Sequence, residues 1–234
     1  MTKHIPNLLT LSNLLFGCLA IISVIKGKIE VAAYFILIAA VFDLLDGLFA
    51  RILNATSEMG KQLDSLADLI SFGLAPTIII YNILINSELA SQSEYSVLLI
   101  LIFPLAAAWR LAKFNIDDSQ AYSFKGLPSP AAGILLASFG LPHVEVWFHD
   151  IFQAPVILAV TWVLALLMVS SIKMFSMKFQ NTSFKDNSIR YIFFVLCVLM
   201  ISPIGFNFTL VTLIIILYII LALANSIFAI SKNQ

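Results

Sequence analysis

Long uncharged, apolar runs constrain this chain more than any other feature. Residues 5–25, 69–87 and 151–172 contain no Asp, Glu, Lys or Arg, and residues 191–231 form a still longer uncharged stretch. A helix needs about 20 mostly apolar residues to cross the hydrocarbon core of a bilayer. The chain is 61% hydrophobic and 11% charged, whereas soluble domains are about 25% charged. We therefore expect an all-α integral membrane protein.

The apolar segments predict a polytopic helical bundle with about eight transmembrane helices. The turn signal Pro203-Ile204-Gly205 divides the longest uncharged stretch in two. The fifth and seventh expected spans are short, which leaves six or seven spans open. We see no cleavable signal and no linker, so residues 1–234 are expected to form a single membrane domain. The expected spans are residues 8–25, 31–52, 60–85, 95–114, 128–143, 152–172, 189–203 and 206–230.

Lysine and arginine are distributed unevenly between the two sides of these spans. If the N-terminus is cytoplasmic and eight spans alternate, only Lys26 and Lys28 of the 13 basic residues lie outside. Because this asymmetry sets membrane topology, we expect both termini in the cytoplasm. The 13 basic residues are balanced by 13 acidic ones, which argues against nucleic acid as a partner, since nucleic acid selects a basic surface.

Four aspartates flank the hairpin between the second and third expected spans. Asp43 and Asp46 are three residues apart, and Asp64 and Asp68 are four apart, so each pair shares a helix face. Carboxylates brought this close repel one another unless cations neutralise them. Mg²⁺ and similar hard cations prefer oxygen ligands, and two such ions can clamp a displacement at phosphorus. A carboxylate-based cation or proton transporter is the alternative.

Glycine and arginine beside the aspartates favour phosphate chemistry. Gly47 lacks a side chain, so a ligand can approach its backbone, and Gly60 offers the same at the start of the third span. Arg51 can pair with a phosphate. Alternatively, Gly47 only eases helix packing and Arg51 only anchors the topology.

The residues from 43 to 68 read Asp43-x-x-Asp46-Gly47-x-x-Ala50-Arg51, then eight residues, then Gly60-x-x-x-Asp64-x-x-x-Asp68. This pattern resembles the signature of the CDP-alcohol phosphotransferase family, with every fixed position present. The resemblance implies a six-helix core, here with extra C-terminal helices, and a homodimer. It also implies enzymes that cleave the pyrophosphate of a CDP-linked donor, transfer the phosphoryl-bearing group to an alcohol and release CMP. Gly47, Ala50, Arg51 and Gly60 would then contact the donor.

The residues after Asp64 narrow the resemblance to one branch. Residues 64–76 read DSLADLISFGLAP and resemble the phosphatidylserine synthases of the family. Further matches lie at residues 5–13, 110–115 and 126–132, and at residues 168–170 followed by Lys178. Residues 172–177 depart from the branch, where an aromatic residue is usual. The branch implies CDP-diacylglycerol as donor, L-serine as acceptor, and phosphatidylserine and CMP as products. It also implies that Asp68, the last aspartate, takes the proton from the serine hydroxyl, which needs a base within hydrogen-bond reach.

Polar residues outside the signature are candidates for substrate binding. Those of the first span lie at helical spacing and either reach the nucleotide or hydrogen-bond between helices. The residues just beyond Asp68 would form an acceptor or phosphate pocket together with basic residues near the cytoplasmic ends of later spans. Alternatively, the basic residues only anchor the membrane topology. The candidates are Asn7, Thr10, Asn13, Ser71, Phe72, Gly73, Arg110, Lys113 and Lys125.

The expected function is therefore metal-dependent phosphatidylserine synthesis at a cytoplasm-facing site, in a prokaryotic cell membrane. Within the family, glycerol 3-phosphate or inositol phosphate remains open as acceptor, and an archaeal-type lipid remains open as donor. The transporter alternative would need an aqueous path to the outer face. The outer halves of the expected spans carry almost no ionisable groups, which argues against such a path.

Overall fold

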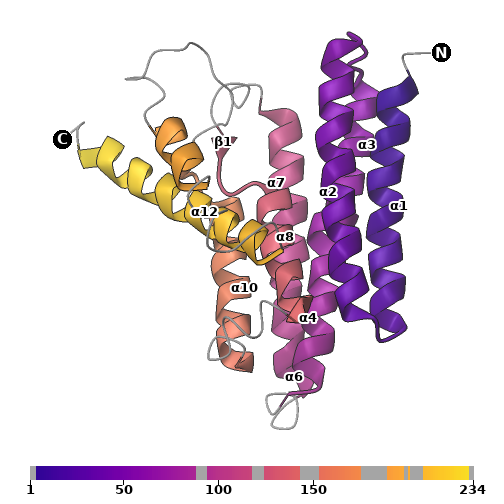
Figure 1. The fold of residues 1–234 in the computed structure, drawn as a ribbon, viewed down its shortest axis with the longest axis vertical. Coiled ribbons are helices and arrows are strands. Elements are labelled where there is room, and N and C mark those ends of the chain that lie inside the picture. The colour runs from indigo at the N-terminus through magenta and orange to yellow at the C-terminus, as the bar shows by residue number, and fades with distance from the viewer. Residues whose placement is uncertain are drawn as a thin grey trace.

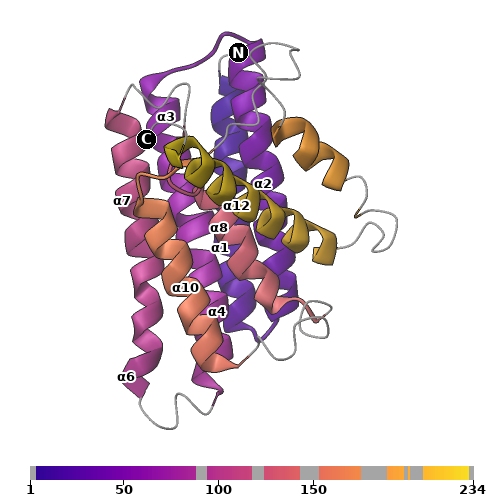
Figure 2. The same ribbon diagram turned by 90° about the vertical axis from the view of Figure 1, so that its left-hand side faces the viewer.

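A computed structural model describes residues 4–87, 94–117, 124–142, 153–174, 189–197, 200 and 208–231. The chain is a bundle of long helices that mostly run alongside one another (Figures 1 and 2). The helices are α1 (Ile5–Ile25), α2 (Ile29–Ile52), α3 (Glu58–Asp68), η2 (Leu69–Leu74), α4 (Ala75–Ile85), α6 (Glu94–Val97), η3 (Leu98–Leu101), α7 (Ile102–Ile116), α8 (Ser129–Ala137), η5 (Ser138–Gly140), α10 (Ala154–Val169) and α12 (Phe208–Ser231).

α1 and α2 form the hairpin that carries the first pair of aspartates. Gly27, in the left-handed region with φ +72°, makes the turn between the two helices. The helices pack through small side chains, since Ala20, Ala32 and Ala33 are fully buried. Small residues allow helix backbones to approach closely in a membrane. α1 also contacts α3, so the end of α2 and the start of α3 lie at the same end of the bundle (Figure 1).

A π-helix, η2, interrupts the third span directly after Asp68. It ends at Leu74, shortly before Pro76 near the start of α4. Proline has no N–H and its ring clashes with the carbonyl four residues earlier, which favours a wider turn at this point. π-bulges inside helices are frequent at functional sites. The sequence pattern predicted one regular helix here, so η2 is a departure from that expectation.

A short ribbon ties the segment before α8 to the end of α10. Strands β1 (Phe124–Lys125) and β2 (Lys173–Met174) pair antiparallel. Gly126 has φ +78°, and its N–H donates to the carbonyl of Ile172 at 2.9 Å. A Cβ at Gly126 would lie 2.3 Å from the carbonyl oxygen of Met168, so the close approach requires glycine. The ribbon thereby fixes where α8 begins.

The fold class predicted from the uncharged runs is confirmed as an all-α polytopic membrane protein. Two shorter apolar helices, Ser129–Gly140 and Ala154–Val169, fall on the fifth and sixth expected spans. The seventh lies partly outside the described residues, although residues 189–197 are helical. α12 contacts α8 and runs obliquely to the other helices in both views (Figures 1 and 2). The helices long and apolar enough to cross a membrane are Ile5–Ile25, Ile29–Ile52, Glu58–Ile85, Tyr95–Ile116 and Thr209–Ser226.

Candidate active site

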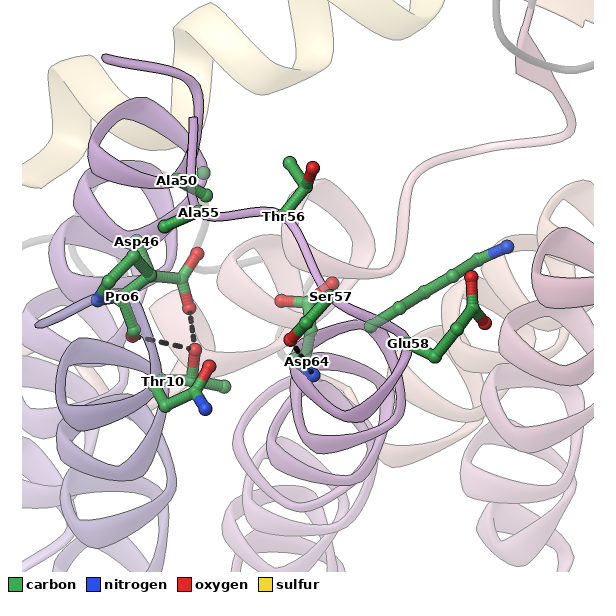
Figure 3. Close-up of a pocket in the computed structure, with 13 residues that line it drawn as sticks. Pro6, Thr10, Asp46, Ala50, Ala55, Thr56, Ser57, Glu58 and Asp64 are labelled. Atoms are coloured by element: carbon green, nitrogen blue, oxygen red, sulfur yellow. Dashed lines mark hydrogen bonds between the residues drawn. The ribbon is translucent and has the colours of Figure 1, made fainter. Parts of the chain in front are cut away.

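A cavity of about 520 Å³ opens between α1, α2 and the start of α3. Figure 3 shows Thr10 and Asp46 on one side of it, with Ser57 and Asp64 on the other. One aspartate of each predicted pair, Asp46 and Asp64, therefore faces the same space. The residues that line the cavity are Pro6, Asn7, Thr10, Asp46, Gly47, Ala50, Ala55, Thr56, Ser57, Glu58, Gly60, Lys61 and Asp64.

Asp43, Asp64 and Asp68 form an acidic cluster beside this cavity. One carboxylate oxygen from each lies within 4.8 Å of those from the other two. Asp68 is buried, and Asp43 and Asp64 are half-buried. Ionised carboxylates at this separation repel each other strongly in a partly buried site. The cluster therefore needs bound cations or protons to be stable, and its oxygen donors suit a hard divalent cation.

α1 supplies two buried polar side chains that contact the aspartates. The hydroxyl of Thr10 donates to Oδ2 of Asp46 at 2.5 Å. Nδ2 of Asn13 donates to Oδ1 of Asp68 at 3.4 Å. Oδ1 of Asn13 is buried and has no hydrogen-bond partner among the described residues. Two of the three polar residues predicted on the first span thus hold aspartates in place, and the third, Asn7, lines the cavity.

The glycines of the signature lie in the cavity wall. A Cβ at Gly47 would have open space around it, because its nearest neighbour would be Nη2 of Arg51 at 3.7 Å. A Cβ at Gly60 would lie 3.1 Å from Oδ1 of Asn7 and from Oγ of Ser57. Arg51 is exposed, and its Nε donates to the carbonyl of Gly47 at 2.8 Å. Arg51 directly follows Ala50, which lines the cavity, but is not itself among the lining residues.

The three candidates just beyond Asp68 lie in helix contacts instead of the cavity. Ser71 is fully buried and donates to the carbonyl of Asn13 at 3.0 Å. Phe72 is fully buried in a core cluster formed with α2 and α4. A Cβ at Gly73 would lie 3.2 Å from Cβ of Ala107 on α7. The acceptor-pocket role assigned to these residues stays a prediction.

The basic candidates differ in their surroundings. Arg110 is partly buried, donates from Nη1 to Oγ of Ser129 at 3.0 Å, and lies within electrostatic range of Asp68. Lys125 forms an ion pair with Asp117 at 3.3 Å, and Lys113 is exposed. Arg110 is therefore the basic candidate that the structure brings toward the acidic cluster.

Residues 3–172 match the family model described as CDP-alcohol phosphatidyltransferase, which is more than half of the chain. The chain belongs to this family. The family resemblance seen in the signature is thereby confirmed, and the protein is an enzyme of the CDP-alcohol phosphatidyltransferase family. The matched range includes the cavity, the acidic cluster and Arg110, and it ends before α12.

Several curated relatives carry names that include serine. A CDP-diacylglycerol–serine O-phosphatidyltransferase of Bacillus subtilis (strain 168) is 37% identical over 172 residues, 73% of this chain and 89% of the relative. One of the same name from Helicobacter pylori (strain ATCC 700392 / 26695) is 34% identical, over 72% of this chain and 70% of the relative. An archaetidylserine synthase of Methanothermobacter thermautotrophicus is 33% identical, over 72% of this chain and 68% of the relative.

Enzymes of this CDP-alcohol phosphatidyltransferase family are metal-dependent, and the acidic cluster fits that requirement. Three carboxylates from two helices offer only oxygen ligands, as Mg²⁺ and Mn²⁺ prefer. Asp46 faces the adjoining cavity and is within electrostatic range of Asp64. The carboxylate ligands that this chain offers therefore suit the divalent cation that the family requires.

Sequence reasoning missed part of the cavity wall. Its loop side and rim come from residues outside the spaced signature: Pro6, Ala55, Thr56, Ser57, Glu58 and Lys61. Ser57 caps α3, because its Oγ accepts the N–H of Gly60 at 3.0 Å. A serine just before an expected helix is a recognised N-cap signal, so this residue could have been placed from the sequence. Lys61 donates from Nζ to the carbonyl of Asn115 on α7 at 2.8 Å, a contact without a sequence signal.

Proposed function

We propose that this protein transfers the phosphatidyl group from CDP-diacylglycerol to the hydroxyl of L-serine. The products are phosphatidylserine and CMP. One observation carries the proposal: Asp43, Asp64 and Asp68 converge within 4.8 Å beside a cavity of about 520 Å³ in a chain of this family. The serine in the names of the relatives supports the choice of acceptor.

Two divalent cations, Mg²⁺ or Mn²⁺, would be held by Asp43, Asp46, Asp64 and Asp68. When bound, such ions neutralise charge on the phosphoryl group and on its leaving group during displacement. Thr10 and Asn13 orient two of these carboxylates through the hydrogen bonds described above. An oriented set of ligands is the usual contribution of neighbouring groups at metal sites.

Asp68 is proposed as the general base. A serine hydroxyl is a weak nucleophile at neutral pH and needs a base within hydrogen-bond reach. Its oxygen attacks the phosphorus that bears diacylglycerol, a new P–O bond forms, and the proton passes to a carboxylate oxygen of Asp68. The P–O bond to the CMP phosphate breaks, and CMP leaves with the bonding electron pair.

The donor nucleotide is proposed to occupy the cavity. Gly47, Ala50 and Gly60 form walls without large side chains, which allows phosphates to approach the backbone. Asn7 offers an amide beside Gly60. Arg51 directly follows Ala50 in the cavity wall, and its flexible stem can reach a phosphate at the rim. Thr10 and Asn13 would contact the nucleotide only through groups that the aspartates leave free.

The acceptor is proposed to bind on the Arg110 side of Asp68. A guanidinium pairs well with a carboxylate, and Arg110 is already within electrostatic range of Asp68. Lys113 and Lys125 would contribute positive potential from farther away. Ser71, Phe72 and Gly73 would shape this side by holding η2 against α1 and α7.

The site is proposed to face the cytoplasm of a prokaryotic cell membrane, with both termini on the same side, in a homodimer. The distribution of lysine and arginine supports this orientation, because basic loops are retained in the cytoplasm. The acyl chains of the donor would remain in the bilayer beside α1 and α2.

The test is CMP release by purified protein in detergent with CDP-diacylglycerol and Mg²⁺ or Mn²⁺. L-serine, glycerol 3-phosphate and inositol phosphate are supplied in separate reactions. We expect release with serine alone, loss of release in Asp64→Asn, and full activity in Glu30→Gln, which changes an acid at the other end of α2. CMP release only with another acceptor would overturn the assignment of serine as the acceptor. No CMP release with any acceptor from folded protein would favour the transporter alternative.

An archaeal-type lipid donor is the second candidate, because one relative is named archaetidylserine synthase. Serine remains the acceptor in both cases, and only the lipid part of the donor differs. The same assay with a CDP-linked archaeal-type lipid in place of CDP-diacylglycerol distinguishes the two. A higher kcat/KM for the archaeal-type donor would replace the diacylglycerol assignment.

A further inference from the structure

Arg110 lies where α7, α8 and α12 meet. Its Nη1 donates to Oγ of Ser129, the first residue of α8, at 3.0 Å. The guanidinium lies within electrostatic range of Asp68 and of Tyr218 of α12, without an ion pair to Asp68 closer than 4.0 Å. Its Nε is buried and has no hydrogen-bond partner among the described residues. The Nη1 group is therefore held by Ser129, and the Nε–H remains available to bind a ligand.

Ser129 is held rigidly enough to act as that anchor. Its side chain is fully buried. The residues just before it are fixed by the ribbon, because the N–H of Leu127 donates to the carbonyl of Leu167 at 3.0 Å. Gly126 permits this close approach, as described above. An arginine side chain samples many rotamers, and a hydrogen bond to a fixed hydroxyl restricts it to few.

We propose that Ser129 is a positioning residue for the acceptor, an inference that rests on the proposed function. It holds Arg110 beside Asp68, so that Arg110 binds the carboxylate of an amino-acid acceptor while Asp68 receives the hydroxyl proton. A guanidinium has five N–H donors in a planar fork. With Nη1 directed at Ser129, the Nε edge retains the two parallel donors that match a carboxylate.

The surroundings of Arg110 fit a carboxylate better than a phosphate monoester. Lys125 is paired with Asp117, and Lys113 is exposed on the surface. Arg110 offers at most one positive charge, which it already shares with Asp68, whereas a phosphate monoester carries nearly two negative charges near neutral pH. The environment of Arg110 thus selects an acceptor with a single carboxylate.

Tyr218 lies within electrostatic range of Arg110. It lies on α12, beyond the residues that the family model matches. Its ring packs edge-on against Phe193, with ring centroids 6.2 Å apart, and it belongs to the apolar core around α8 and α10. A guanidinium shielded from water binds a carboxylate more tightly than an exposed one, because the local dielectric constant is lower. α12 thereby contributes to the acceptor side of the site.

The test is steady-state kinetics of Ser129→Ala with both substrates varied. We expect the KM for serine to rise about tenfold or more, as for loss of a hydrogen bond to a charged group. The KM for CDP-diacylglycerol should stay within about twofold, because neither Ser129 nor Arg110 lines the donor cavity. Ser129→Thr keeps the hydroxyl and should restore most of the affinity for serine.

Ser138→Ala is the matched control, since Ser138 is buried at the start of η5, directly after α8, and its hydroxyl donates to the carbonyl of Leu135. If Ser129→Ala does not yield folded protein, Ser129→Cys decides, because a thiol of similar size accepts hydrogen bonds only weakly and should also raise the KM for serine. An unchanged KM for serine in a folded variant overturns the inference, and so does an equal rise for CDP-diacylglycerol. A wild-type enzyme without serine-dependent CMP release overturns the proposed function instead.

Discussion

Gly17→Ala is expected to weaken both the fold and the site. Gly17 lies on α1 against η2, and a Cβ there would be 2.4 Å from Oγ and 2.9 Å from Cα of Ser71. Oγ of Ser71 cannot rotate away freely, because it donates to the carbonyl of Asn13. α1 must therefore move away from η2. Asn13 lies one turn from Gly17 on the same face, so this movement lengthens its contact to Asp68, which is already 3.4 Å.

The size of the effect follows from two opposing contributions. Overpacking a close contact costs about 1–3 kcal/mol. Alanine improves helix propensity over glycine by about 0.8–1.0 kcal/mol. Because one of the clashing atoms is backbone, the cost falls in the upper half of its range, and the net loss is about 1–2 kcal/mol. For a protein of this size that corresponds to a fall in Tm of about 2–8 °C.

Gly47→Ala is the matched comparison, because the same atoms are added to a helix that has open space. The nearest neighbour of the new Cβ would be a flexible guanidinium nitrogen of Arg51 at 3.7 Å. We expect Tm to be unchanged or slightly higher. Gly47 lines the cavity, so the methyl group should instead raise the KM for CDP-diacylglycerol. Gly17→Ala and Gly47→Ala should therefore separate stability from donor binding.

The assay measures thermal unfolding in detergent by intrinsic fluorescence, together with CMP release at saturating substrates. Gly17→Ala should lower both Tm and kcat, while Gly47→Ala should lower only the apparent affinity for the donor. A Gly17→Ala variant with wild-type Tm and kcat would refute the claim that the α1–η2 contact positions Asn13. An equal fall in Tm for Gly47→Ala would refute the contrast between crowded and open glycines.

Three further predictions concern the acidic site. Asp68→Asn should lower kcat by about 10²-fold or more, the usual contribution of a general base, while CDP binding measured by calorimetry stays detectable. Treatment with EDTA should abolish CMP release, and added Mg²⁺ or Mn²⁺ should restore it. Thr10→Val removes the hydroxyl that donates to Asp46, so half-maximal activity should need several-fold more Mg²⁺.

Each of these three predictions would be contradicted by a specific result. Loss of CDP binding together with kcat in Asp68→Asn would argue that the residue acts as a ligand and not as the base. Full activity of chelator-treated protein in metal-free buffer would exclude the metal requirement. Thr10→Ser keeps the hydroxyl and should behave as wild type, whereas wild-type metal dependence of Thr10→Val would contradict the role given to its hydrogen bond.

The aspartates and the membrane fold could both be predicted from the sequence. Charged side chains are costly in hydrocarbon, so uncharged runs of about 20 residues predict membrane-spanning helices. Five of the expected spans are found as long helices. The helical spacing of Asp43, Asp46, Asp64 and Asp68, together with a short loop, allowed the two pairs to converge. Three of the four carboxylates converge as expected.

The surroundings of these carboxylates could not be predicted in the same way. The sequence did not indicate that the π-turn of η2 and the close approach of α1 and α8 place Ser71 and Phe72 in helix contacts. Ser129 belongs to a matched motif, but its hydrogen bond to Arg110 depends on a ribbon formed by segments far apart in the chain.

The difference between the features that could be predicted from the sequence and those that could not has a physical basis. Spacing along a helix and exclusion of charge from a bilayer act over a few residues, so the sequence by itself determined the spans and the paired aspartates. The partners of Arg110 on α8 and α12 depend on how helices dock, and docking is decided by the shapes of many small residues at once. Only the tertiary structure could show that Arg110 is anchored with one donor edge left free.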